Sequence, residues 1–216
     1  MSFKTSGKTP FIKLKGYKET VARLAKMCED PTGAFENTCK DLKKRVPGKV
    51  ADAVRAQFNI KKNEILPNGT KGKKAPTRKA GKISTTGSTI GSLAFYYTGR
   101  PLTPTHFGMK PSMPSGMPIK KGIQYKIKKG GWRSLPKGKR HFFLNAGQTR
   151  KRASMKNTLI PFKRKGTKRD APIEPVKTTS LPQMIEYPKV REQITHDINK
   201  LTEERFNHHL KRAIEK

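Results

Sequence analysis

The chain has 216 residues, of which only 32% are hydrophobic. This length and composition predict one domain with a modest core and long arms. Its 49 lysines and arginines against 15 acidic residues give a net charge of +34, which requires an anionic partner or many counterions. No apolar run could span a bilayer, and the basic N-terminal stretch lacks the apolar block of a signal peptide, so we expect neither a membrane protein nor a secreted one.

Residues 1–64 predict an N-terminal helical region. Apolar residues recur at helical spacing in YKETVARLAKMCED, in AFENTCKDLKKRV and in KVADAVRAQFNI. We expect Pro31 to Gly33 to end the first of these helices, and Pro47 with Gly48 to interrupt the pattern between the other two. The prediction is therefore one broken helix or two to three short ones, each with one apolar stripe.

Two cysteines, Cys28 and Cys39, lie in this helical region. Their spacing fits neither a close zinc pair nor a redox CxxC motif, and no histidine lies near them. We therefore expect two reduced, partly buried thiols in a reducing compartment, with no metal and no cofactor.

Residues 65–169 form a second region, defined by charge. No aspartate or glutamate lies between Ile65 and Arg169, whereas 26 lysines and arginines do. Residues 1–64 carry 15 basic and 7 acidic side chains, and residues 170–216 carry 8 of each. A solvated surface usually mixes both signs, so the middle region is expected to face something anionic. Soluble basic loops, the alternative, should contain some acidic residues among the basic ones.

The basic region also predicts antiparallel strands. Residues 66–82 indicate an exposed loop, and Ile83–Thr86 and Ser92–Thr98 have strand composition. HFFLNAG and NTLIPFKR predict two further strands, the first over Phe142, Phe143 and Leu144. IKKGIQYKIKK predicts the clearest strand, with apolar and cationic faces. Its apolar positions are Ile123, Tyr125 and Ile127, and its polar positions are Gln124, Lys126 and Lys128.

Residues 170–216 predict a proline-rich strap followed by a helix. RDAPIEPVKTTSLPQMIEYP holds four prolines, too many for a helix, and is too apolar for a linker. An extended apolar segment loses little entropy on docking, so it is expected to cover either a neighbouring subunit or its own domain. The candidates for an assembly interface are Pro172, Ile173, Val176, Leu181, Pro182, Met184 and Ile185.

The last 28 residues predict one long helix with balanced charges. One stripe of this helix contains Val190, Ile194, Ile198, Leu201, Leu210 and Ile214. The expected order is N-terminal helices, a central antiparallel β region with long basic loops, and a C-terminal helix. The predicted fold class is α+β.

Catalytic patterns are missing from this sequence. Metal-dependent nucleases and polymerases hold their ions with carboxylates, and residues 66–168 contain none. His208 and His209 are adjacent and point to different faces of a helix, and no glycine pattern has P-loop or dinucleotide-binding spacing. We therefore expect no enzyme, no catalytic residue, no cofactor and no metal.

The dense cations of the middle region are suited to contacting phosphates without reading sequence. Few aromatic residues are interleaved with them, so stacking on single-stranded bases is less favoured. The alternative is a set of flexible solvated loops. The phosphate-facing candidates are Lys120, Lys121, Lys126, Lys128, Lys129, Arg150, Lys151 and Arg152.

Several segments, taken in order, resemble one family. These are VADAVRAQFNIKKNEI, ISTTGSTIGSLAFYYTG, the cationic GIQYKIKKGGWRSL, HFFLNAG, and RDAPIEPVKTTSLPQMI before the final helix. Together they are similar to the phage minor tail protein Z family, the tail-completion proteins of long-tailed bacteriophages, from about Val50 to Lys216. The order of glycine, alanine and phenylalanine in HFFLNAGQTRKR departs from the family pattern.

The resemblance implies a structural virion protein at the head-proximal end of the tail, assembled in the host cytoplasm. Such a protein finishes the tail so that it joins the head and admits the genome end. The implied partners are further copies of the chain in a ring, with six favoured, tail terminator or tail tube proteins, and the head–tail connector. Duplex DNA in the lumen would match the cationic strands, and no membrane is implied.

The alternative function is that of a ribosomal or other RNA-binding structural protein, which shares the charge and the small core. That class threads basic arms without apolar residues into RNA. Here the basic centre contains predicted strands, and the two ends are the more balanced helical parts. This arrangement favours an assembly subunit.

Overall fold

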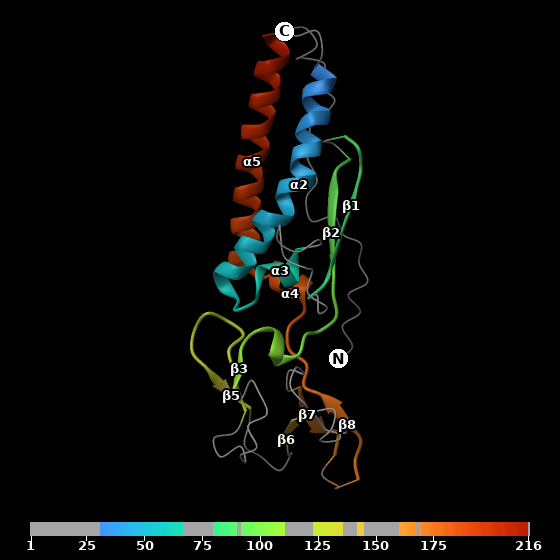
Figure 1. Cartoon of the computed structure of the whole chain (residues 1–216), viewed down its shortest axis with the longest axis vertical. Coiled ribbons are helices and arrows are strands. Elements are labelled where there is room, and N and C mark those ends of the chain that lie inside the picture. The colour runs from blue at the N-terminus through green and yellow to red at the C-terminus, as the bar shows by residue number, and fades with distance from the viewer. Residues whose placement is uncertain are drawn as a thin grey trace.

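The computed structural model describes residues 31–66, 80–89, 92–110, 123–135, 142–144, 160–166, 168 and 170–215. Two long helices and a β-hairpin occupy one end of the elongated molecule, and two small antiparallel sheets occupy the other (Figure 1). The predicted α+β class is confirmed. The helix expected in YKETVARLAKMCED lies outside the described residues.

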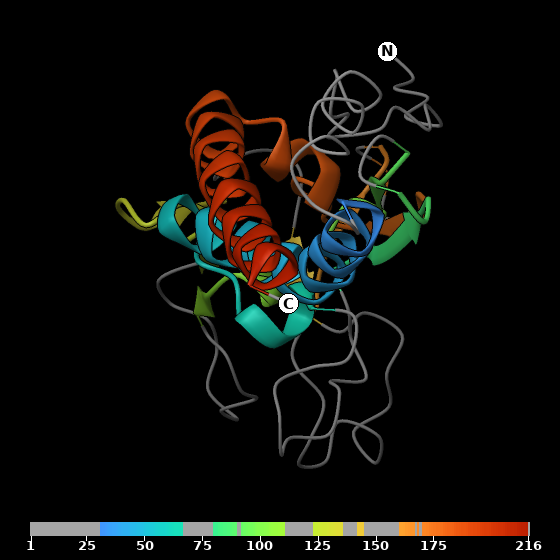
Figure 2. The same ribbon diagram turned by 90° about the horizontal axis from the view of Figure 1, so that it is seen from above.

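Helices α2 (Pro31–Gln57) and α5 (Pro188–Ile214) lie side by side and run antiparallel (Figures 1 and 2). Each begins at a proline, whose fixed φ suits the first helical position and whose missing N–H costs nothing there. Their facing apolar stripes form most of the core, because neither stripe can be buried by its own helix. Buried members are Phe35, Cys39, Leu42, Val46, Val50, Val54, Val190, Ile194, Ile198 and Leu201.

The interruption expected at Pro47 and Gly48 is wrong, because α2 continues through both residues. An interior proline removes one backbone hydrogen bond and costs about 3 kcal/mol or more. Here Pro47 is itself buried, and the neighbouring Val46 and Val50 are fully buried in the core. Burial of this apolar stripe offsets the local cost, so tertiary packing overrides the helix-breaking signal.

The stripe predicted for α5 is confirmed only over its first half. Val190, Ile194, Ile198 and Leu201 are buried, but Ile214 is 55% exposed. Leu210 is half-buried. The helix begins next to α4 and the end of α2, and its last turns extend beyond the packed part of the core (Figure 1).

The strands predicted over Ile83–Thr86 and Ser92–Thr98 are confirmed as β1 (Lys82–Thr86) and β2 (Ala94–Thr98), which form a hairpin that pairs antiparallel from Lys82 opposite Thr98 to Thr86 opposite Ala94. Leu93 and Phe95 are buried in the core, as the alternation predicts, and Tyr97 packs against it. Burial raises the pKa of the Tyr97 phenol well above its usual range. The hairpin lies along the side of α2 (Figures 1 and 2).

The strap belongs to the chain's own core over its second half. Leu181–Ile185 forms a short helix, α4, against the sequence expectation of extended chain. Ser180 and Gln183 form a reciprocal capping box at its start, which satisfies two backbone N–H groups and allows a helix despite Pro182. Helix α4 contacts β2, α2 and α5.

The interface expectation is therefore corrected for four of the seven strap candidates. Leu181 and Met184 are fully buried, Ile185 is 2% exposed, and Val176 is 8% exposed, all within this chain. Pro182 is half-buried and lies against Gly99. Only Pro172 and Ile173 remain exposed, with Ile173 at 41%.

Two three-stranded antiparallel sheets complete the structure. The first consists of β3 (Met109–Lys110), β4 (Gln124–Tyr125) and β5 (Arg133–Ser134). The second consists of β6 (Phe142–Leu144), β7 (Pro161–Arg164) and β8 (Ile173–Pro175), which confirms the strands predicted in HFFLNAG and NTLIPFKR. The short helix α3 (Lys62–Ile65) follows α2, and the 3-10 turn η1 (Pro104–His106) lies between β2 and β3.

The strand predicted across IKKGIQYKIKK is much shorter than expected, because only Gln124 and Tyr125 belong to β4. Beyond them the backbone turns towards the helical end of the molecule. The N–H of Lys129 donates to the carbonyl of Gln57 over 3.0 Å, and Lys128 forms an isolated bridge with Phe58. The end of α2 therefore takes the place of a long partner strand. In the part of the chain described, no helix is long and apolar enough to cross a membrane.

Cys39 provides a direct test of the helical core. Its side chain is a free thiol with 1% exposure, and burial raises its pKa. Because the thiolate is the reacting species, we expect Cys39 to react with a thiol reagent at neutral pH far more slowly than in unfolded chain. The measurement uses a Cys28→Ser variant, so that all signal comes from Cys39. Reaction at the rate of the denatured protein would contradict this packing.

Candidate nucleic-acid interface

The sheet β3–β4–β5 presents one polar, cationic face. Lys110 lies opposite Gln124, and Gln124 lies opposite Ser134, so these three side chains share a face. Two further residues join them by strand alternation, Lys126 and Trp132. We call these five residues the Lys110 face: Lys110, Gln124, Lys126, Trp132 and Ser134.

Contacts at Gly108 support this assignment. The N–H of Lys126 donates to the Gly108 carbonyl over 2.8 Å, which continues the pairing beyond the strand. A Cβ added at Gly108 would lie 3.8 Å from Cβ of Lys126 and 3.9 Å from Cη2 of Trp132. The Lys110 ammonium lies 4.6 Å from the centroid of the Trp132 ring, within the range of a cation–π contact. The lysines and the tryptophan therefore form one continuous surface.

The opposite face of this sheet carries Tyr125 and the exposed Arg133, and also a small apolar cluster that holds the strands together. Met109 and Ile123 are each 6% exposed and form a small cluster with the half-buried Leu135. The N–H of Leu135 donates to the Ile123 carbonyl over 2.9 Å. A sheet with strands this short needs such a cluster, because few backbone bonds hold it.

Backbone and amide hydrogen bonds attach the sheet to the end of α2. The N–H of Asn59 donates to the Ile127 carbonyl over 2.7 Å, and its Nδ2 donates to the Phe107 carbonyl over 2.9 Å. Partly buried Ile127 also packs against the main core. The Lys110 face is thus held in a fixed position relative to the helices.

The three described phosphate-facing candidates occupy different settings. Lys126 is half-buried on the Lys110 face, and Lys129 is exposed. The Lys128 ammonium instead lies 4.1 Å from the centroid of Tyr187, at the start of α5, and Tyr187 packs edge-on against Phe58 at 5.7 Å. Lys126 and Lys128 therefore do not form the single cationic stripe that the sequence predicts. The remaining candidates lie outside the described residues: Lys120, Lys121, Arg150, Lys151 and Arg152.

The second sheet carries cations that are partly neutralised. Lys163 forms an ion pair with Glu174 at 3.2 Å, and Lys165 approaches the same carboxylate at 3.9 Å. The hydrogen bond from Lys163 lowers the pKa of Glu174, and the charges of Lys163 and Lys165 act in the same direction. The Arg164 guanidinium donates to the Ala171 carbonyl over 3.2 Å. The sequence supplies no such carboxylate within β3–β4–β5, so that sheet presents the less compensated charge.

Sequence reasoning missed Lys110 and Trp132. Neither lies in a dense basic run, and a residue directly after Gly130 and Gly131 has no face that periodicity can predict. The signal available was that Trp132 is the single tryptophan of a strongly cationic region that has few aromatic residues.

Histidine–carboxylate contacts serve the fold. His106 Nδ1 lies 2.6 Å from Glu64 Oε2, with the two side chains 10% and 13% exposed, and this contact joins η1 to α3. His209 Nε2 lies 3.2 Å from Asp41 Oδ2 and joins α5 to α2. Among the described residues no group of three histidine, cysteine or acidic side chains is placed to hold a metal.

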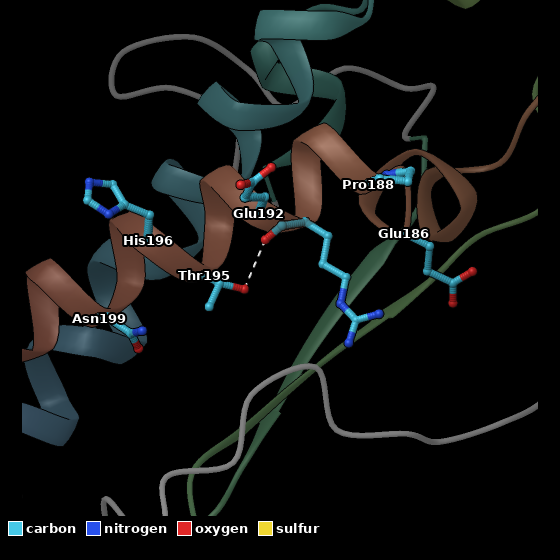
Figure 3. Close-up of a pocket in the computed structure, with 7 residues that line it drawn as sticks. Glu186, Pro188, Glu192, Thr195, His196 and Asn199 are labelled. Atoms are coloured by element: carbon cyan, nitrogen blue, oxygen red, sulfur yellow. Dashed lines mark hydrogen bonds between the residues drawn. The ribbon is translucent and has the colours of Figure 1, made fainter.

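A shallow hollow of about 530 Å³ lies beside the first turns of α5 (Figure 3). Its lining comes from one stretch of chain, Glu186 to Asn199, and includes Arg191, Glu192 and His196. The Thr195 hydroxyl donates to the Arg191 carbonyl over 2.9 Å, so it is bonded within its own helix. The hollow is an open helix surface.

Comparisons with models of protein families, with curated proteins and with solved structures found no match for this chain.

Proposed function

We propose that the chain is a structural virion protein that completes the head-proximal end of a phage tail. It acts as a subunit of a ring, with six copies favoured, for head–tail joining and for positioning the genome end. Its partners in this proposal are neighbouring copies, the tail terminator or tail tube, the head–tail connector, and duplex DNA in the lumen. The resemblance described above and the distribution of charge support this proposal.

The observation that carries the proposal is the uneven charge along the long axis of the molecule. The β1–β2 hairpin at the helical end also belongs to the region without carboxylates, and β8 at the sheet end carries Glu174. Helix α5 belongs to a region with equal numbers of basic and acidic residues, and it packs along α2 at one end. The two small sheets at the other end come largely from the region without carboxylates (Figure 1). Subunits arranged with the sheets inward would line a channel with positive charge, which suits phosphates and reads no sequence.

Of the seven strap candidates, Pro172 and Ile173 at the start of β8 are the two that are exposed and can make an assembly contact. Both are exposed, and β8 lies at an edge of its sheet. When a partner covers an exposed isoleucine on an edge strand, apolar area is removed from water and the contact is stabilised. In the proposed ring this edge contacts a neighbouring copy or a tail protein.

Sedimentation of the purified chain after nuclease treatment tests the proposal. We expect an assembly of about six subunits of 24.3 kDa that survives removal of nucleic acid, because protein contacts hold a ring together. The matched variant is Ile173→Asp, which should reduce the number of subunits in the assembly while the circular dichroism spectrum stays unchanged.

A monomer that sediments as a larger particle only with bound RNA would contradict the proposal. That outcome would favour the RNA-binding alternative, because such a protein needs RNA to compensate its charge.

A further inference from the structure

Trp132 is a large apolar side chain left on a cationic surface. It is the single tryptophan of the chain, and 42% of it is exposed. It lies directly before β5 on the Lys110 face. Covering a tryptophan ring removes a large apolar area from water, so an exposed ring beside lysines can stabilise binding of an anionic ligand that also offers a flat apolar surface.

The position of the ring is defined by its neighbours. The Lys110 ammonium lies 4.6 Å from its centroid, and Gly108 lies beside its Cη2 edge. Gly108 carries no side chain that could cover the ring, and a Cβ there would lie 2.7 Å from Nδ2 of Asn59. The ring is thereby held at the sheet surface with part of its area open to a ligand.

The charge around the Trp132 ring indicates which class of ligand this surface can bind. Lys110 and Lys126 flank the ring, and the sequence has no carboxylate from residue 66 to 168. A ligand that satisfies both features carries negative charge and flat π-surfaces. Unpaired nucleotides have both, whereas duplex DNA stacks its bases against one another and an acidic peptide offers carboxylates with few rings.

We propose that the Lys110 face binds unpaired nucleotides, with Trp132 stacked on a base and with Lys110 and Lys126 contacting the adjoining phosphates. This goes beyond the proposed duplex contact, which needs phosphates alone. It also does not depend on a role in a tail. The lysines supply a salt-dependent attraction common to all nucleic acids, and Trp132 adds a preference for unpaired bases.

Fluorescence of the full chain tests this inference, because all tryptophan emission comes from Trp132. Titration with oligothymidylate should quench the emission in a saturable manner, since a stacked base contacts the ring. Binding of labelled oligothymidylate should weaken about tenfold in Trp132→Ala and less in Trp132→Phe, which keeps an aromatic ring. Duplex affinity should be unchanged in both variants. Lys110→Gln should flatten the salt dependence and retain the quenching.

Polyglutamate and blunt duplex are the matched anionic controls. Equal quenching by either of them, no quenching by oligothymidylate, or an equal loss on all ligands in Trp132→Ala would overturn the inference. Weak duplex binding together with normal oligothymidylate quenching would instead count against the proposed lumen contact alone. Thermal melting of both variants shows that loss of binding is not loss of folding.

Discussion

Replacing Leu181 and Met184 together with aspartate is expected to unfold the subunit. Both side chains are fully buried between the hairpin and the two long helices. Removing each apolar side chain costs about 1.5–3 kcal/mol, and burying an unpaired carboxylate costs several kcal/mol more. The sum is comparable to the whole stability of a domain, about 5–15 kcal/mol. Circular dichroism and urea denaturation measure this loss.

The matched control places the same charge on the exposed part of the strap. Ile173→Asp changes a side chain that is 41% exposed, so it should cost less than about 1 kcal/mol. If the Leu181 and Met184 double variant instead stays folded with unchanged stability, α4 is not part of the core. Its side chains would then be free for an assembly interface.

Replacing Lys110, Lys126 and Lys129 with glutamine is expected to weaken duplex binding strongly and alike on unrelated sequences. Each phosphate contact contributes about 0.9 to the slope of log affinity against log salt, so loss of three contacts lowers the slope by roughly 2.7. At about 0.1 M salt this corresponds to a loss on the order of several hundredfold. Titrations of two unrelated duplexes over a range of salt concentrations measure both quantities.

The control removes three lysines from the helical end, Lys44, Lys200 and Lys211, all of which are exposed. Net charge falls by the same amount in both variants. A specific cationic face predicts a much smaller change for the control. Equal changes in slope would show that duplex responds to total charge, and that the sheet end makes no particular contact.

The elements with a clear apolar period were predictable from sequence. Strand β2 follows from the alternation of Leu93, Phe95 and Tyr97, and α5 follows from Val190, Ile194 and Ile198. The continuous α2 was not predictable, because local chemistry at Pro47 signals a break and only the surrounding core overrides it. Helix α4 was not predicted, because four prolines in the segment favour extended chain. The capping box of Ser180 and Gln183 stabilises a helix here only because the turn that follows it is buried.

The cationic site was predicted in part. Lys126 lies on a polar strand face opposite buried Ile123, as the alternation implies. Lys128 departs from that face because the ladder ends at Tyr125 and the backbone then bonds to the end of α2. Sequence periodicity cannot report where a ladder ends, since that depends on segments distant in the chain. The meeting of Lys110 with Trp132 depends on the same long-range pairing.

Electron cryo-microscopy of virions that contain the chain tests the central proposal most directly. We expect a ring of this subunit at the head-proximal end of the tail, with β3–β4–β5 turned towards the lumen and the α2–α5 pair turned outward. Density for the chain elsewhere in the particle, or a ring whose sheets face away from the lumen, would contradict the proposed function.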